Sequence, residues 1–275
     1  MRSSLEIFRM ATARSEVVLA TEALVEAPNW DPDGQSLLVN CDGRLYRVPL
    51  DRAPELVEVP TGPADACNND HGFSPDGSRI ALSHRQDGRS TIFTVGAEGG
   101  EPTQVTARNP SYWHGWSPDG TRIAYVGNRD GAFDIFTCPA DGGPELRLTE
   151  RSGHNDGPDY APDGAHIWFN SDRTGHAQIW RMGSDGGAPR RMVESTSVDW
   201  FPHPSPDGAC VLYLSYPAGT LGHPRDRDVA IRMTDADGRG ARTLIELFGG
   251  QGTLNVPCWS PDGSAFAYVR YGPAG

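Results

Sequence analysis

The fold of this 275-residue chain is decided by the stretch Trp116-Ser117-Pro118-Asp119-Gly120-Thr121-Arg122-Ile123-Ala124-Tyr125. Its central tripeptide, Pro-Asp-Gly, occurs six times, with the aspartate at positions 33, 76, 119, 163, 207 and 262. The spacings of 43, 43, 44, 44 and 55 residues match the ~40–45 residues of one four-stranded propeller blade. Proline presets φ and glycine takes the left-handed conformation, so each copy predicts a tight turn between two strands. We assign these turns no catalytic role.

Four strands can be identified in each complete repeat. A β-rich run such as Ile123-Ala124-Tyr125-Val126 follows the turn, and a second run ends in an aliphatic–aromatic pair such as Ile135-Phe136. A Gly-rich hairpin such as Asp141-Gly142-Gly143 then leads to a short outer strand. Alternating apolar positions, β-branched and aromatic residues and regular turns all indicate strands rather than helices.

The two ends of the chain complement each other. The start, Glu6-Ile7-Phe8, has the third-strand pattern of Asp134-Ile135-Phe136, and Val17-Val18-Leu19-Ala20 follows as an outer strand. The last repeat holds only two strands, so the ends together complete one blade and pair edges that would otherwise stay bare. The sequence therefore predicts a single all-β domain over 1–275, a six-bladed β-propeller of four antiparallel strands per blade. Blade 6 is shared between 1–20 and 254–272.

Composition excludes several classes of partner. The chain has 24 Lys and Arg against 36 Asp and Glu, a formal charge of −12, and the arginines are scattered. Nucleic-acid binding needs clustered basic residues, so no nucleic-acid partner is expected. No run of ~18 apolar residues occurs, so no membrane partner is expected either. Five cysteines without a C-x-x-C pair, and no signal-peptide pattern at the start, favour a reduced, cytoplasmic and monomeric protein.

The repeats, exemplified by 116–125 and by Asn170-Ser171-Asp172-Arg173, resemble the WD40-like (PD40) repeats of the TolB C-terminal propeller family. The resemblance covers essentially the whole chain and implies the six-bladed fold. The family's namesake acts through protein partners. No Gly-x-Ser-x-Gly elbow is present, so an attached hydrolase of the propeller-peptidase kind is not expected.

A ligand site is expected where the loops before the first strands and between the second and third strands meet at one mouth of the channel. One of these loops contains an insertion around 217–228. The insertion is recognised because the separation of Asp207 and Ile231 is eight residues longer than the corresponding separation in the regular repeats. This insertion is interpreted either as a binding loop or as a solvated loop with balanced charges. The candidate ligand-binding residues combine aromatic side chains for stacking, arginines for a carboxylate and a mouth-loop amide: Trp113, Trp200, Arg129, Arg173, Arg225 and Asn155.

Four histidines, His71, His114, His154 and His203, lie in or just before the first strands of consecutive blades. Neutral imidazoles from several strands can bind a divalent metal in the channel. Oligogalacturonate lyases, which resemble this repeat type, hold a metal through channel histidines. The alternative is structural, because His71 and His114 occupy the slot that proline occupies in the other blades.

Two main functions follow as hypotheses. The first is a binding module that recognises a protein segment or a small ligand, such as a carbohydrate, at the mouth. The second is a metal-dependent lyase or hydrolase acting on an acidic carbohydrate, for which no catalytic residue can be named. A purely structural propeller docked in a larger assembly is a third interpretation.

Overall fold

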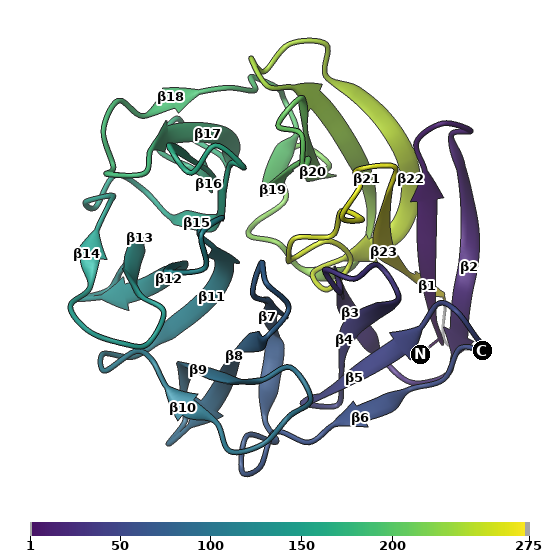
Figure 1. Ribbon diagram of the computed structural model, residues 1–275. Coiled ribbons are helices and arrows are strands. Elements are labelled where there is room, and N and C mark those ends of the chain that lie inside the picture. The colour runs from purple at the N-terminus through teal and green to yellow at the C-terminus, as the bar shows by residue number, and fades with distance from the viewer. Residues whose placement is uncertain (1, 273–275) are drawn as a thin grey trace.

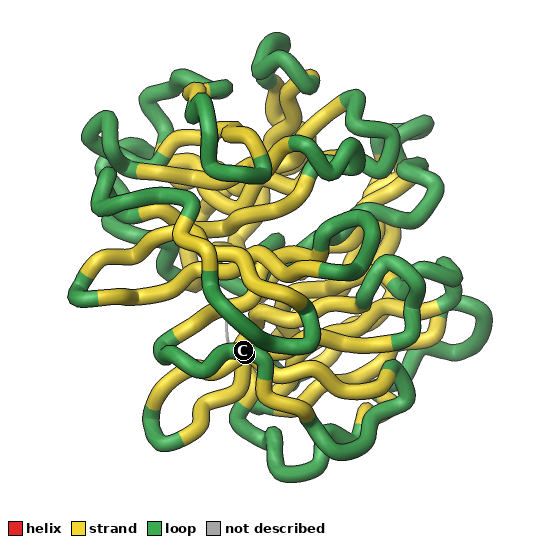
Figure 2. The backbone as a smooth tube through the Cα atoms, turned by 60° about the vertical axis from the view of Figure 1, so that its left-hand side comes forward, coloured by secondary structure: helices red, strands yellow, loops and turns green. Residues whose placement is uncertain are grey.

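The computed structural model describes residues 2–272, which form a ring of six β-sheet blades around a central channel (Figure 1). The described residues form strands and loops without a helix (Figure 2), and so include no helix that could cross a membrane. The six-bladed all-β architecture predicted from the repeats is confirmed. Of the predicted 1–275 domain, residues 1 and 273–275 lie outside the described part.

Blades 1 to 5 are four-stranded antiparallel sheets, each formed by consecutive strands from the channel outward. Blade 1 contains β3 (Val25–Trp30), β4 (Ser36–Cys41), β5 (Arg44–Pro49) and β6 (Val57–Val59). Blade 2 contains β7 (Cys67–Phe73), β8 (Arg79–Gln86), β9 (Arg89–Gly96) and β10 (Thr103–Gln104). Blade 3 contains β11 (Ser111–Trp116), β12 (Arg122–Arg129), β13 (Ala132–Pro139) and β14 (Leu146–Arg147). Blade 4 contains β15 (Asn155–Tyr160), β16 (His166–Ser171), β17 (Gln178–Gly183) and β18 (Arg190–Arg191), and blade 5 contains β19 (Val198–Pro204), β20 (Cys210–Tyr216), β21 (Arg225–Asp235) and β22 (Arg242–Gly250).

The Pro-Asp-Gly turns have the predicted geometry. In blade 2 the Gly77 amide donates to the carbonyl of Ser74 at 2.9 Å, and Gly77 has φ +69°. The Asp76 carboxylate accepts hydrogen bonds from the Ser74 hydroxyl and the Ser78 amide, which lower its pKa to about 2. The aspartate is therefore committed to its own turn, as expected for a structural residue.

Each innermost strand of blades 1 to 5 contains a β-bulge or similar irregularity of register within the strand. In β11 the pairing passes from Trp113–Tyr125 directly to Gly115–Ala124, which leaves His114 as the extra residue. In blades 1, 4 and 5 the residue before a proline adopts positive φ within the bulge: Ala27, Gly157 and Phe201. A bulge re-aims side chains away from the regular alternation of a strand.

Blade 6 closes the ring with both ends of the chain. Its strands are β23 (Ala265–Gly272), β1 (Arg2–Arg9) and β2 (Arg14–Thr21), with Ile7 opposite Ala267. The predicted pairing of the chain's start with its end is confirmed. The innermost segment of this blade is reduced to a single bridge between Trp259 and Phe266.

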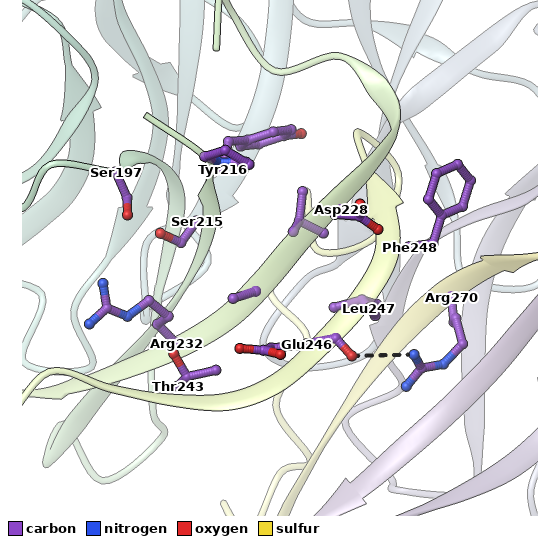
Figure 3. A pocket seen from close by; sticks show the side chains of 13 residues that line it. Ser197, Ser215, Tyr216, Asp228, Arg232, Thr243, Glu246, Leu247, Phe248 and Arg270 are labelled. Atoms are coloured by element: carbon purple, nitrogen blue, oxygen red, sulfur yellow. Dashed lines mark hydrogen bonds between the residues drawn. The ribbon is translucent and has the colours of Figure 1, made fainter. Parts of the chain in front are cut away.

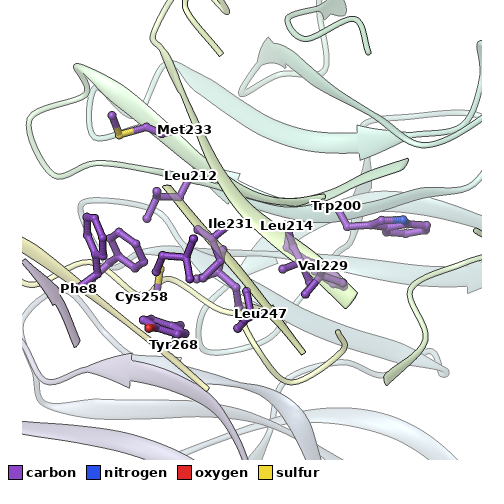
Figure 4. Close-up of a cluster of buried hydrophobic side chains, with 14 of the residues drawn as sticks. Phe8, Trp200, Leu212, Leu214, Val229, Ile231, Met233, Leu247, Cys258 and Tyr268 are labelled. Atoms are coloured by element: carbon purple, nitrogen blue, oxygen red, sulfur yellow. The ribbon is translucent and has the colours of Figure 1, made fainter. Parts of the chain in front are cut away.

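The core lies between the faces of neighbouring blades. In the cluster between blades 5 and 6, Leu212 and Ile231 pack with Phe8 and Tyr268, and all four side chains are buried (Figure 4). Burying an aliphatic or aromatic side chain of this size contributes about 1.5–3 kcal/mol. Hydrogen bonds also cross between blades; for example, the Trp259 indole donates to the carbonyl of His203 at 3.0 Å.

Candidate functional site

A cavity of about 250 Å³ opens at the channel mouth, on the face where the chain enters the innermost strands. Five consecutive blades contribute to its wall, and the predicted position of the site among these loops agrees with this geometry. The lining residues are Asn68, Asp70, Tyr112, His114, Val126, Phe133, His154, Asp156, Phe201, His223, Gln251 and Asn255.

The centre of the cavity is the carboxylate of Asp156. Its Oδ1 lies 3.2 Å from Nε2 of His114, and its Oδ2 lies 3.3 Å from Nε2 of His154. His223, from the blade 5 insertion, brings its Nε2 to 3.8 Å from Oδ2. Three imidazoles from blades 3, 4 and 5 therefore surround one carboxylate from blade 4.

The bulges explain why these side chains meet. His114 is the extra residue of the β11 bulge, and Asp156 directly precedes the Gly157 bulge of β15. Asp70 lies in the irregular part of β7, between the Cys67 and His71 pairs. Regular strands would direct these residues alternately toward the two neighbouring blades, whereas the irregular backbone brings them to the channel mouth.

Burial and charge set the protonation states of the cluster. Burial acts to lower the pKa of His114, but the hydrogen bond to Asp156 and the charges of Asp70 and Asp156 raise it above the usual value. The pKa of His154 is also raised, because its contact with Asp156 outweighs burial. Burial acts to raise the pKa of Asp156, yet its contacts with His114 and His154 hold it well below its usual range. Asp156 is therefore ionised at neutral pH.

Burial and charge also shift the pKa values of Asp70 and His223 in the cavity. Burial raises the pKa of Asp70 to about 6, although the charge of His114 opposes the shift. Burial lowers the pKa of His223, and the charge of Asp156 offsets part of that shift. The cavity therefore contains both hydrogen-bond donors and acceptors, and the pKa values of its titratable groups are shifted in different directions.

Aromatic rings hold the imidazoles in place. Phe133 stacks on His154 with the ring centroids 4.5 Å apart, and Trp200 meets His223 edge-on at 4.5 Å. Phe201 stacks near His114 at 6.1 Å. The cavity is therefore a polar centre with a partly aromatic wall, as in many small-ligand pockets.

Only two of the four histidines proposed as metal ligands line the cavity. His71 is completely buried, and burial lowers its pKa to about 4. His203 lies on the channel strand β19, with Nδ1 3.0 Å from Asp159 and Nε2 3.1 Å from the carbonyl of Leu254. Within residues 2–272, no group of three or more His, Cys, Asp or Glu side chains has a geometry that could hold a metal ion. The four predicted donors do not come together, and we derive no chemistry through a metal.

The two tryptophans expected as stacking residues are buried. Trp113 is inaccessible on β11 and packs against Gly72 of the neighbouring blade. Trp200 is also buried and lies behind the cavity, against His154 and His223. Trp113 therefore packs between blades, whereas Trp200 packs against two of the imidazoles that line the cavity.

Arg129, Arg173 and Asn155 are already engaged. Arg129 forms two hydrogen bonds with the carboxylate of Glu145 and others with backbone carbonyls. Arg173 donates to the side-chain oxygen of Asn155 at 2.8 Å, and its guanidinium lies 4.6 Å from the Trp180 ring centre. Asn155 is fully buried. These contacts leave the three side chains in structural roles.

Arg225, predicted to bind a ligand, does not line the mouth cavity. Its Nη1 is 3.9 Å from the carboxylate of Glu26 in blade 1, so the blade 5 insertion reaches two other blades through His223 and Arg225. Burial raises the pKa of Glu26 to about 7, although the charge of Arg225 opposes the shift. The insertion therefore contributes His223 to the mouth cavity, while its Arg225 also lies 3.5 Å from Asp226 of the same loop and its Leu221 is 91% exposed.

A larger groove of about 600 Å³ lies on the outer part of blade 5, where Leu247 and Phe248 form part of its wall (Figure 3). Arg270 of blade 6 borders it and donates to the carbonyl of Glu246 and to the carboxylate of Glu6. Its charged residues, Asp228, Arg232, Glu246 and Arg270, form no ion pair with one another among the described residues, in contrast to Asp156 and its imidazoles at the mouth. We therefore place the candidate site in the mouth cavity.

Asp156, Asp70 and His223 were not identified from the sequence. Asp156 and Asp70 stand seven and six residues before their turn aspartates, whereas His114 stands five before its own. Counting from the turns therefore does not align them. For His223 the only signal was its place within the insertion.

Comparison with known proteins supports the propeller fold and identifies similar sequences. The sequence model of the TolB beta propeller domain (PD40) matches residues 114–222. An uncharacterised protein of Agrobacterium fabrum is 53% identical over 274 residues, covering 99% of this chain and 94% of the relative.

Solved structures show the same architecture. A candidate TolB from Agrobacterium tumefaciens is 53% identical with a TM-score of 0.98, covering 100% of this chain and 99% of that one. TolB from Acinetobacter baumannii is 18% identical with a TM-score of 0.70, covering 91% of this chain and 64% of that one. An oligogalacturonate lyase in complex with manganese is 16% identical with a TM-score of 0.58, covering 90% and 74%. The last two similarities concern the fold alone.

Proposed function

Because this chain belongs to the TolB-like β-propeller family, we propose that it is a binding module that recognises a protein segment or a small ligand at the mouth of its channel. The carrying observation is the contact of Asp156 with His114 and His154 inside a preformed cavity. Perturbed titratable groups gathered in a concave pocket are typical of functional sites.

The cavity dimensions favour a narrow ligand group. A volume of about 250 Å³ admits a side chain, a chain end or a small ring rather than a folded surface. The imidazoles of His154 and His223 and the amides of Gln251 and Asn255 can donate or accept hydrogen bonds to it. The Phe133 and Phe201 rings supply apolar contact.

The proposal is tested with two histidine variants that differ in location. His154 and His166 have similar side-chain exposures, 34% and 41%, and each lies beside an aspartate. His154 lines the mouth, whereas His166 lies at the Pro-Asp-Gly turn on the opposite face. Purified His154→Ala, His166→Ala and unaltered protein are each incubated with an extract of the source cells, and bound molecules are identified by mass spectrometry.

We expect a ligand that is retained by the unaltered protein and by His166→Ala but is lost from His154→Ala. Circular dichroism and thermal unfolding check that both variants are folded. Equal retention by the two variants, or retention that only His166→Ala abolishes, contradicts binding at the mouth.

A further inference from the structure

A second hollow continues from the mouth cavity across the top of blade 2. It has a volume of about 580 Å³ and lies over the turn between β8 and β9. Asn68 and Tyr112 line both this groove and the mouth cavity. The two spaces therefore meet at these two side chains.

The size of the mouth cavity suggests that it is one end of a longer site. Ligand pockets usually occupy about 300–1,000 Å³. The mouth cavity, at about 250 Å³, is below that range, whereas the adjoining groove is within it. A ligand that enters the mouth has room to continue over blade 2.

Two unpaired arginines border the groove. Arg85 and Arg89 are exposed on either side of the β8–β9 turn. Among the described residues neither guanidinium forms an ion pair with a carboxylate, in contrast to Arg129 and Arg147. Asp42 and Asp65 also line the groove, so its charges are mixed. The register pairs Arg85 with Ser90 and Arg89 with Gln86, so the two arginines approach the groove from opposite faces of the hairpin. A guanidinium group is well suited to a carboxylate because it offers several donors in a fixed plane.

Tyr112 links the two spaces electrostatically. Burial raises the pKa of its hydroxyl, the charges of Asp70 and Asp156 raise it further, and the charge of Arg85 lowers it. The Tyr112 side chain therefore lines both spaces and responds to charges in each of them. It is placed to contact the part of a ligand that passes from one space to the other.

We propose that the mouth cavity and the groove over blade 2 form one elongated site, and that Arg85 and Arg89, from opposite faces of the β8–β9 hairpin, bind carboxylate groups of the ligand. The inference rests on the proposed binding function and specifies the chemistry of its ligand. The carboxylate can belong to a free polycarboxylate or to an acidic side chain of a peptide. The two sources are distinguished by experiment.

The test uses citrate and an acetylated, amidated triglutamate peptide as probes, with binding measured by isothermal titration calorimetry. The unaltered protein is compared with the double variant Arg85→Gln/Arg89→Gln. The matched control is Arg190→Gln/Arg242→Gln, which removes two exposed arginines from the outer strands of blades 4 and 5. Both double variants change the net charge equally.

We expect at least one probe to bind below about 10 mM, and the groove variant to weaken it at least about fivefold. The control should change affinity less than about twofold, because scattered exposed charges act weakly at physiological salt. Binding of citrate alone identifies a free polycarboxylate, and binding of the peptide alone identifies a protein segment. Absence of binding by both probes, or equal weakening by both double variants, overturns the proposal.

His154→Ala separates this inference from the proposed function. If the probe is lost from the groove variant but not from His154→Ala, the single elongated site is overturned. In that case the mouth function is still decided by the cell-extract comparison of His154→Ala with His166→Ala. If that comparison fails while the groove variant weakens the probe, the proposed mouth function fails instead.

Discussion

Nε2 of His114 lies 3.2 Å from Oδ1 of Asp156, and this contact joins two neighbouring blades at the channel mouth. The other oxygen of the same carboxylate faces His154 at 3.3 Å. One ionised group thus favours the protonated form of two imidazoles, and the three groups titrate together. The contact combines a structural role between blades with control of the charge inside the cavity.

Asp156→Asn is expected to lower the pKa of both His114 and His154, because the negative charge that favours their protonation is removed. The raised pKa of each imidazole stabilises the folded protein fully below its usual pKa of 6.5, and this stability is lost as pH rises through the folded pKa. We expect the variant to lose about 1–3 kcal/mol of unfolding free energy at pH 6 and to lose less at pH 9.

Histidine titration by NMR and urea unfolding at the two pH values measure both effects. Asp163→Asn, beside His166 on the opposite face, is the control and should leave His114 and His154 unchanged. An unaltered His154 titration in Asp156→Asn would show that the carboxylate does not govern the cluster.

Glu26→Gln is expected to stabilise the protein at alkaline pH. Burial raises the pKa of Glu26 from 4.5 to about 7, so the folded state resists ionisation and loses stability as pH rises between these values. The glutamine variant lacks this loss, and we expect a gain of about 1–3 kcal/mol at pH 8 and almost none at pH 4.5. Urea unfolding at both pH values tests the expectation. A variant that is less stable at pH 8 would show that the contact with Arg225 outweighs the burial of the carboxylate.

Ile7→Ala is expected to cost about 2–4 kcal/mol of unfolding free energy, because Ile7 is buried where the first strand joins β23. Val17→Ala, in the same hairpin but 61% exposed on β2, should cost less than about 0.5 kcal/mol. Chemical denaturation measures the unfolding free energy of both variants and so compares the buried Ile7 with the exposed Val17. Similar small losses for both would mean that the first hairpin contributes little to the stability of the ring.

Gly72→Ala is expected to destabilise the protein by about 1–3 kcal/mol or more, because an added Cβ would overlap the Trp113 ring. Trp113→Phe in the same chain should recover part of the loss, since the smaller ring leaves room for the methyl group. Thermal unfolding of the single and double variants gives the coupling energy between positions 72 and 113. Independent, additive effects would contradict direct packing of Trp113 on Gly72.

The fold was predictable because its signals are local and repeated. Ser74-Pro75-Asp76-Gly77 forms the expected turn from four adjacent residues, and its copies mark every blade. The closure was predictable because the start of the chain carries the pattern of a missing third strand. These conclusions require only the identification of the residues that form strands and the order of those strands along the chain.

The candidate site was predictable in location but not in composition. Trp113 and His114 are neighbours in sequence, yet the β11 bulge sends His114 to the cavity while Trp113 is buried between blades. The extra residue before proline in β15 similarly changes the register that brings Asp156 to the mouth. Which side chain enters the channel depends on these single-residue irregularities, and neither periodicity nor spacing reveals them.

The pairing of β1 with β23 also constrains the order in which parts of the chain can fold. Tyr268 donates a hydrogen bond to the Glu6 carboxylate, although 262 residues separate them. During synthesis the β1–β2 hairpin must therefore wait for almost the whole polypeptide to emerge, and an isolated two-stranded hairpin is only marginally stable in water. Strands β1 and β2 therefore emerge long before the strand that holds them in the ring, and contacts of such long range slow folding.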